Sequence, residues 1–156
     1  MVVVLAALIA LFASARLRYS GSAVKLPAAD CNADLWKHVY LPERLRVLEA
    51  CTAVAGRVVS LRRESDGDLH LALDPDLKSV LNLVNAIHAH GDLVVEVVCE
   101  HAPPNGDAKV GCAGFAPQVA NPKVGDRVRV TGAYVTDRDN GWNEIHPVTR
   151  IESLGP

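Results

Sequence analysis

Strict alternation of side chains over residues 52–61 (TAVAGRVVSL) constrains the fold of this chain more than any other feature. Val54 and Val58 fall on one face of an extended segment, and Ala55 and Val59 fall on the other. A period of two, carried by β-branched residues, is typical of a β-strand. Gly56 lies inside the run, where a glycine indicates a bulge or a sharp bend. The pattern therefore predicts a long first strand that turns a corner.

Four further strands are expected after this one. Residues 64–67 (ESDG) are a turn signal and residues 68–73 (DLHLAL) return from it, so the first two strands form a hairpin. Residues 93–99 (LVVEVVC) are apolar apart from one glutamate, which is typical of a central strand. Residues 127–134 (RVRVTGAY) and 144–151 (EIHPVTRI) each follow a turn that contains glycine, and the second of them closes the domain.

Helical periodicity is confined to two places. Apolar residues recur at helical spacing over residues 77–89, after the strand-breaking Asp-Pro-Asp and before Gly91. Residues 30–49 contain Pro42, which interrupts a helix, so a turn of helix is expected on each side of it.

Together these elements predict a mainly β fold, a small five-stranded OB-like Greek-key barrel with one or two short helices. The OB helix usually lies between the third and fourth strands, whereas the best helical pattern here precedes the third strand. A β-sandwich or another small barrel is the alternative.

The N-terminal sequence is typical of an export signal. Residues 2–15 are uncharged and apolar and end in Ala13-Ser14-Ala15, which suits a signal peptide cleaved before Arg16. No Lys or Arg precedes this run, so an uncleaved membrane anchor and a buried helix are the alternatives. Residues 16–30 are expected to be a linker, and residues 31–156 the folded domain. The protein is predicted to be secreted or extracytoplasmic, with membrane contact only through residues 2–15 if they are retained.

Four cysteines behind an export signal suggest two disulfides. Cys31, Cys51, Cys99 and Cys112 contain no CxxC pair and do not match zinc-finger spacing. Three pairings exist, of which Cys31 with Cys51 and Cys99 with Cys112 is favoured because the second would restrain a loop rich in Pro and Gly. Four buried thiols in a cytosolic protein are the alternative.

Composition argues against nucleic-acid binding. The chain has 16 Lys and Arg against 18 Asp and Glu, so it offers no basic field for a polyanion. Aromatic residues make up only 4% of it, which leaves few platforms for stacking single-stranded bases.

Residues 54–73, which end in DGDLHLAL, and residues 125–151 resemble a group of exported prokaryotic proteins of unknown function. The shared pattern is a DGD-x-H hairpin and a last strand that reads GW-x-EIHPV. This resemblance implies an OB-like fold and export, and it brings no assigned activity. Asp66-Gly67-Asp68 is also similar to the staphylococcal-nuclease type of OB enzyme, in which such a segment supplies a calcium ligand. The Asp-x-Pro-Glu segment of those enzymes is missing here.

Two acid-x-His units are the candidate metal ligands. Asp68 and His70 are two residues apart in one strand, as are Glu144 and His146 in another, so each pair shares a face. If the faces meet, two carboxylates and two imidazoles form a set suited to Zn, Mn or Fe. A structural polar network and a solvated sheet face are the alternatives.

Two further residues are candidates for ligand contact. Trp142 lies in the loop before the last strand, where OB folds often contact ligands, or else it covers the barrel end. Glu96 sits in an apolar strand and must face water, pair with Arg or His, or shift its pKa. The remaining histidines, His38, His88, His90 and His101, are expected at the surface.

The leading functional hypothesis is a non-catalytic extracytoplasmic binding module, without a cofactor, for an unknown ligand or protein partner. A metal-dependent, thermonuclease-like hydrolase that uses Asp68, His70, Glu144 and His146 is the alternative. A nucleic-acid-binding OB protein is the third hypothesis.

Overall fold

The computed structural model describes residues 23–104 and 106–155. The predicted leader, residues 1–15, and residues 16–22 of the predicted linker lie outside the described residues. Within the described part of the chain, no helix has the length and apolar character needed to cross a membrane.

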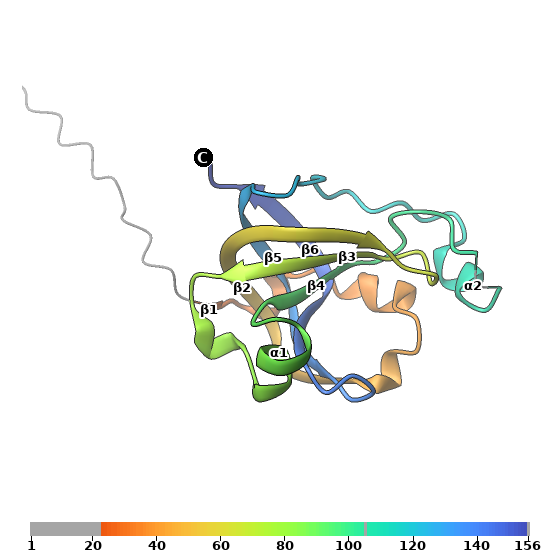
Figure 1. The fold of residues 1–156 in the computed structure, drawn as a ribbon. Helices are drawn as coiled ribbons and strands as arrows, with labels where there is room; N and C mark the ends of the chain where they lie inside the picture. The colour runs from red at the N-terminus through yellow and green to blue at the C-terminus, as the bar shows by residue number, and fades with distance from the viewer. Residues whose placement is uncertain (1–22, 105, 156) are drawn as a thin grey trace, which may run out of the picture.

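Five strands close into a ring, which confirms the prediction of a mainly β chain (Figure 1). The described residues form six strands: β1 (Val24–Lys25), β2 (Leu45–Arg63), β3 (Leu69–Pro75), β4 (Leu93–Val97), β5 (Arg127–Asp137) and β6 (Asn143–Ser153). Strands β2 to β6 form the ring, and β1 pairs with β2 alone. They pair in the order β1-β2-β3-β4-β6-β5, and β2 also pairs with β5. Only the pairing of β4 with β6 is parallel among these described strands. All five predicted strands are present.

Strand β2 joins the two sides of the ring. Its first part, from Leu45 to Arg57, pairs with β5, and its last part, from Gly56 to Arg63, pairs with β3. The strand begins seven residues earlier than the alternation indicated, because the pairing with β5 extends back to Leu45 across two register shifts.

The sequence predicts a bulge or a sharp bend at Gly56, and the structure has no bulge there. The register of β2 against β3 shifts between Val58 and Ser60, not at the glycine. A Cβ added at Gly56 would lie 2.4 Å from the carbonyl oxygen of Asp74 and 2.9 Å from the Leu73 side chain. The glycine therefore permits a close approach of β3 to β2 at the place where β2 changes partners.

The helices are short. They are the 3-10 helices η1 (Ala28–Asp30), η2 (Ala33–His38), η3 (Pro42–Arg44) and η4 (Lys78–Val80), and the α-helices α1 (Leu83–His88) and α2 (Ala108–Cys112). A turn of helix was expected on each side of Pro42. Helix η2 ends before it at His38, but η3 begins at Pro42 itself, because proline is favoured at the first position of a helix. The segment that contains η2 and η3 lies on the same side of the ring as α2 (Figure 1), where His38 stacks on Phe115 with ring centroids 3.8 Å apart.

The continuous helix predicted over residues 77–89 is wrong. The chain is extended at Leu81, and α1 begins only after Asn82, whose side chain accepts the N–H of Asn85 in a capping box. Asn85 is fully buried and donates to the carbonyl oxygens of Asp92 and Asn143, whereas Leu83 and Ile87 are exposed. The buried face of this helix is therefore centred on an amide, which apolar spacing does not reveal.

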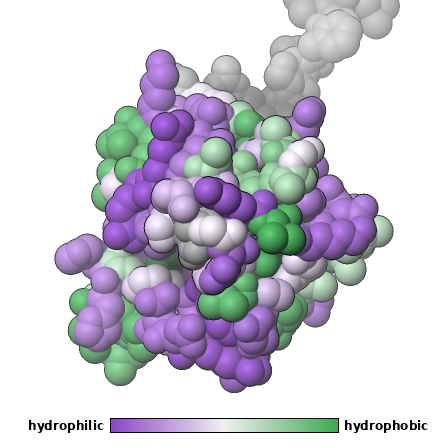
Figure 2. Space-filling view, turned by 90° about the vertical axis from the view of Figure 1, so that its right-hand side faces the viewer, coloured by the Kyte–Doolittle hydropathy of each residue, from purple (hydrophilic) through white to green (hydrophobic). Residues whose placement is uncertain are grey.

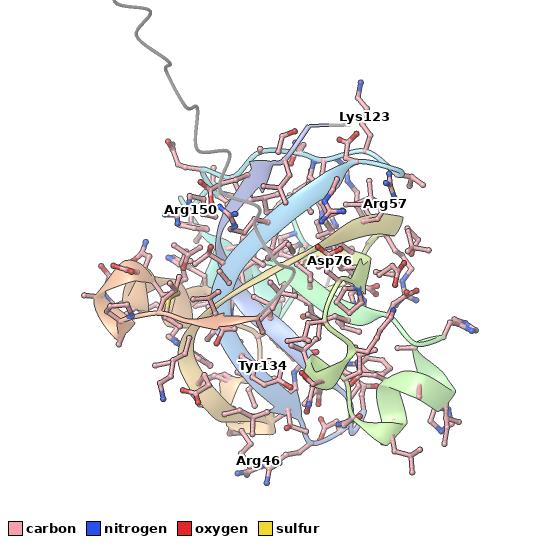
Figure 3. The ribbon with its side chains drawn as sticks, turned by 90° about the vertical axis from the view of Figure 1, so that its left-hand side faces the viewer. Arg46, Arg57, Asp76, Lys123, Tyr134 and Arg150 are labelled. Atoms are coloured by element: carbon pink, nitrogen blue, oxygen red, sulfur yellow. A yellow bond between two sulfur atoms is a disulfide. The ribbon has the colours of Figure 1, made fainter. Side chains whose placement is uncertain are left out.

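The ring encloses the main apolar core. Its fully buried members include Leu71, Leu73, Leu93, Val130 and Ile145, contributed by β3, β4, β5 and β6. Tyr134 of β5 (Figure 3) ties this core to the segment before α1, because its hydroxyl donates to the carbonyl oxygen of Val80 at 2.6 Å.

A second, smaller core lies under the N-terminal segment, where Leu35 and Val39 pack with Val98, Ala133 and Val135. The face shown in Figure 2 is mostly hydrophilic, and its hydrophobic residues appear as separate patches. Both cores are thus interior features, and the polar groups buried among them require a specific explanation.

Candidate functional site

Three adjacent strands bring a set of ionisable side chains together on the face of the sheet that points away from the main apolar core. Asp68 immediately precedes β3, Glu96 belongs to β4, and Glu144 and His146 belong to β6. Strand β4 lies between β3 and β6, so residues from both neighbours reach the Glu96 side chain. All four side chains are buried, with 6% exposure for Glu96 and 1% or less for the others. We call these four residues the buried charge cluster.

His146 is the centre of the buried charge cluster. Its Nδ1–H group donates to Glu144 Oε1 at 3.1 Å, and Nδ1 lies 2.9 Å from Glu96 Oε2, with which it forms an ion pair. Its Nε2 points to Asp68 Oδ2 at 3.7 Å, which is too long for a hydrogen bond. Each ring nitrogen of His146 therefore faces carboxylate oxygen.

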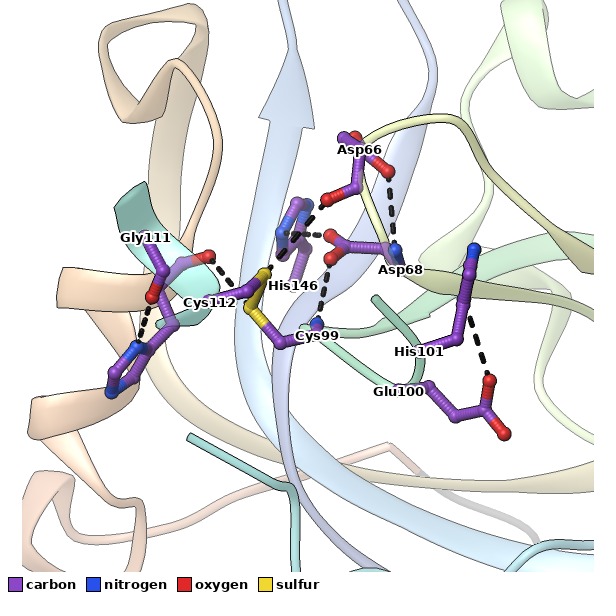
Figure 4. Close-up of a disulfide and its surroundings, with 9 residues drawn as sticks. Asp66, Asp68, Cys99, Glu100, His101, Gly111, Cys112 and His146 are labelled. Carbon is purple, nitrogen blue, oxygen red and sulfur yellow. Dashed lines mark hydrogen bonds and ion pairs between the residues drawn. A yellow bond between two sulfur atoms is a disulfide. The ribbon is translucent and has the colours of Figure 1, made fainter. Parts of the chain in front are cut away.

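Asp68 is held from the opposite side by the backbone of the disulfide-bonded Cys99. The Cys99 N–H donates to Asp68 Oδ1 at 2.8 Å (Figure 4). The other oxygen, Oδ2, has no hydrogen-bond partner within the described part of the chain, and neither has His146 Nε2. Two buried polar atoms thus face one another across 3.7 Å without a hydrogen bond.

The charges in the cluster depend on one another. Burial by itself would lower the pKa of His146, but Glu96 and Glu144 raise it to about 10, so the imidazole is protonated at neutral pH. Burial by itself would raise the pKa of Glu96, but His146, His70 and Arg44 lower it to about 2. His146 and Glu96 therefore form a buried ion pair.

The pKa values of the other two carboxyl groups, Asp68 and Glu144, are raised instead of lowered. Burial raises the pKa of Asp68 to about 7 against the opposing attraction of His146. Burial also raises the pKa of Glu144, and the neighbouring Glu96 carboxylate adds to this rise. The cluster holds more carboxyl groups than cations, so the acids that His146 does not neutralise tend to keep their protons.

Two residues link the cluster to its surroundings. Trp142 Nε1 donates to Glu144 Oε2 at 2.9 Å. Arg44, from η3, places its guanidinium between Glu96, at 3.7 Å, and the fully buried Asp137. The Asp137 carboxylate also accepts the backbone N–H groups of Asp139 and Asn140, which fixes the turn before β6.

A polar cleft of about 340 Å³ opens beside the cluster. Glu96 and Trp142, the two residues predicted from the sequence to contact a ligand, both line it, together with Tyr40. The remaining charged groups on its wall are Arg44, Arg62, Glu64, Asp66, His70 and Asp139. The cleft therefore combines two aromatic rings with four carboxylates, two guanidinium groups and an imidazole.

The two acid-x-His units converge only in part. Asp68, Glu144 and His146 meet in the buried charge cluster. His70 does not: its ring lies at the cleft, 3.8 Å from Glu96 Oε1 and 3.3 Å from Glu64 Oε1. Glu96, and not His70, completes the cluster. Glu96 belongs to β4, which lies between β3 and β6, next to which the two acid-x-His units lie.

Arg44 and His38 were not recognised from the sequence. Arg44 lies next to Pro42 in a segment with no acid-x-His pattern, and its carboxylate partners are distant in the chain. His38, expected at the surface, is partly buried, and its Nδ1 donates to the carbonyl oxygen of Gly111 at 2.6 Å. His88 and His90 are exposed, as predicted, and His101 is intermediate.

The structure contains both disulfides in the favoured pairing, Cys31–Cys51 and Cys99–Cys112. No free cysteine is present among the described residues. The first bridge ties the N-terminal segment to β2, and the second closes the loop that carries α2. This arrangement is compatible with an oxidising compartment.

No family model and no curated protein matches this chain.

Proposed function

We propose that this protein is an extracytoplasmic OB-like binding module, and that the cleft beside the buried charge cluster is its ligand site. The observation that carries the proposal is the position of Trp142 and Glu96: Trp142 lies just before β6, Glu96 lies in β4, and both line the same cleft. Small-molecule sites are typically concave, with volumes of about 300–1,000 Å³ and a few convergent polar groups. At about 340 Å³ the cleft suits a small ligand.

The strand order supports the OB-like assignment. The ring runs β2-β3-β4-β6-β5 and back to β2, with β4 and β6 parallel. In a five-stranded Greek-key barrel of the OB type, the first strand likewise pairs with the second and the fourth. Helix α2 lies between the third and fourth strands of the ring, where the OB helix usually lies, and α1 is an additional short helix. The two disulfides support an extracytoplasmic location.

The chemistry of the cleft favours a neutral or cationic ligand. Carboxylates outnumber guanidinium groups on its wall, and Arg44 is already engaged by Glu96 and Asp137. Aromatic faces such as those of Tyr40 and Trp142 attract organic cations and stack on sugar-like surfaces. Arg62 pairs with Glu64 at 2.6 Å, so a small anion would meet Asp66 and Asp139 with no unpaired cation among the described residues of the wall.

Fluorescence provides the test, because Trp36 and Trp142 are the only two tryptophans in the chain. Trp36 packs on the smaller core and does not line the cleft. Trp36→Phe therefore leaves Trp142 as the sole reporter. We expect tetramethylammonium or glucose to change the emission of this variant in a saturable manner, and acetate to leave it unchanged.

Two matched variants locate the binding. The probe should change the emission of Trp36→Phe but not that of Trp142→Phe, whose remaining tryptophan lies away from the cleft. In calorimetry, Trp142→Phe should bind the same probe more weakly than the wild type. Equal responses to acetate and tetramethylammonium, or no response to any of the three probes, would contradict the proposal.

A further inference from the structure

We propose that the buried charge cluster is a binding site for a divalent transition-metal cation, with Asp68, Glu96 and His146 as its protein ligands. This inference does not rest on the proposed function of the cleft. It starts from the two buried atoms that lack a hydrogen-bond partner in the described part of the chain, Asp68 Oδ2 and His146 Nε2. Both belong to side chains that are at least nine-tenths buried, and each points at the other.

The spacing of these atoms suits a shared ion. Two ligands on a tetrahedral cation, with bonds of about 2.0–2.2 Å, lie roughly 3.4 Å apart. Asp68 Oδ2 and His146 Nε2 are 3.7 Å apart. One ligand atom from each of Asp68, Glu96 and His146 lies within 4.8 Å of the other two. Three protein ligands with an open position are typical of zinc sites that bind a further molecule.

The hydrogen bonds made by His146 and Asp68 leave Nε2 of the histidine and Oδ2 of the aspartate available to an ion. His146 Nδ1 donates to Glu144 Oε1 at 3.1 Å, which directs Nε2 toward the ion. A carboxylate that accepts the second nitrogen of a ligating histidine is the usual outer partner at such sites. Asp68 Oδ1 accepts the Cys99 N–H, which leaves Oδ2 available. Glu144 is thus a positioning residue, itself held by the Trp142 indole.

The donor set indicates which ions fit. Two carboxylates and an imidazole suit Zn²⁺, Mn²⁺ or Fe²⁺ and lack the thiolate that soft ions prefer. Glu96 also lines the cleft, so an ion that enters from the cleft meets this ligand first. Binding there would release the Nε2 proton of the His146 imidazolium and the proton that Asp68 retains, so the cation would replace these protons beside the buried carboxylates at the base of the cleft.

The test uses the full-length chain with both disulfides formed, stripped with a chelator and titrated calorimetrically with Zn²⁺ or Mn²⁺ alone. We expect a single equivalent to bind. Asp68→Asn, which keeps an oxygen to accept the Cys99 N–H, and Glu96→Gln should each weaken binding at least tenfold. Glu144→Gln should weaken it by about 10- to 100-fold, as outer-shell variants do. His88→Gln, on the exposed end of α1, is the matched control and should leave binding unchanged.

A second measurement covers any variant that fails to fold. In the wild-type protein, Zn²⁺ should shift the Nε2 nitrogen resonance of His146 to the range of a metal-bound imidazole, whereas the His88 ring should not respond. No binding in calorimetry, or binding that Asp68→Asn leaves intact while the His146 resonance stays in place, would overturn the proposal. Either result would leave the cleft hypothesis open to its own test.

Discussion

Asp68 accepts the backbone N–H of Cys99 at 2.8 Å, so the Cys99–Cys112 disulfide is joined directly to the buried charge cluster. The disulfide anchors the loop that follows β4. Its Cys99 also supplies the only hydrogen bond of the Asp68 carboxylate within the described part of the chain. Cystine formation and the position of Asp68 are therefore linked.

The two disulfides should have similar effects on stability and different effects on the cluster. Their sequence separations are 13 and 20 residues, so loop entropy gives each about 3 kcal/mol of stabilisation. We expect Cys99→Ala/Cys112→Ala and Cys31→Ala/Cys51→Ala to lower the unfolding free energy by comparable amounts in urea. Only the first variant should speed hydrogen exchange at the amide of residue 99. Equal exchange rates in both variants would contradict the link to Asp68.

Stability should fall on both sides of mildly acidic pH in metal-free protein. Glu96 has a pKa lowered to about 2 in the fold, so its contribution is present above its ordinary value of 4.5 and is lost as pH falls toward 2. His146 has a pKa raised to about 10, so its contribution is present below 6.5 and is lost as pH rises toward 10. Asp68, raised to about 7, likewise loses its contribution between pH 3.8 and 7.

Urea midpoints measured from pH 3 to 10 in the presence of a chelator check this expectation. His146→Gln should remove much of the decline between pH 6.5 and 10, because the group that titrates there is gone. A wild-type midpoint that rises steadily up to pH 10 would show that the imidazolium does not stabilise the fold.

Replacing His146 should be costly at neutral pH. Removal of one partner from a buried ion pair costs about 3–5 kcal/mol, because the other charge is left without compensation. In His146→Gln that charge is Glu96, beside Glu144 and Asp68. We expect the deficit in unfolding free energy to shrink as pH is lowered from 7 to 5, since protonation neutralises the stranded carboxylates. His88→Gln, at an exposed position, should lie within about 0.5 kcal/mol of the wild type.

The alternation of side chains was sufficient to predict the five strands of the ring, although not β1, and loop composition was sufficient to favour the cysteine pairing. Both depend on local pattern. The position of Asn85 could not be predicted, because the partners that make its burial favourable are backbone carbonyls at Asp92 and Asn143. Apolar spacing assigned Ile87 to the buried face of this helix, and Ile87 is exposed.

In the candidate site, too, some features follow from local sequence pattern and others depend on long-range packing. The spacing of Glu144 and His146 correctly placed them on one face, and Glu96 was recognised as a charge that needs a partner. Which strands lie next to one another decides that Glu96, and not His70, completes the cluster. That order is a long-range property of the ring, and Arg44 reaches the site only through the same long-range packing.

Gly56 should be the least replaceable position in β2. A methyl group there would meet the Asp74 carbonyl oxygen at 2.4 Å, and that backbone is fixed by the β2–β3 pairing. We expect Gly56→Ala to lower the unfolding free energy by about 1–3 kcal/mol or more, the usual cost of overpacking. Gly106→Ala is the matched control, because nothing lies within 4 Å of its added Cβ. If Gly56→Ala unfolds at the same urea concentration as Gly106→Ala, β2 and β3 can separate at little cost where β2 changes partners, and the ring is looser there than the close contact indicates.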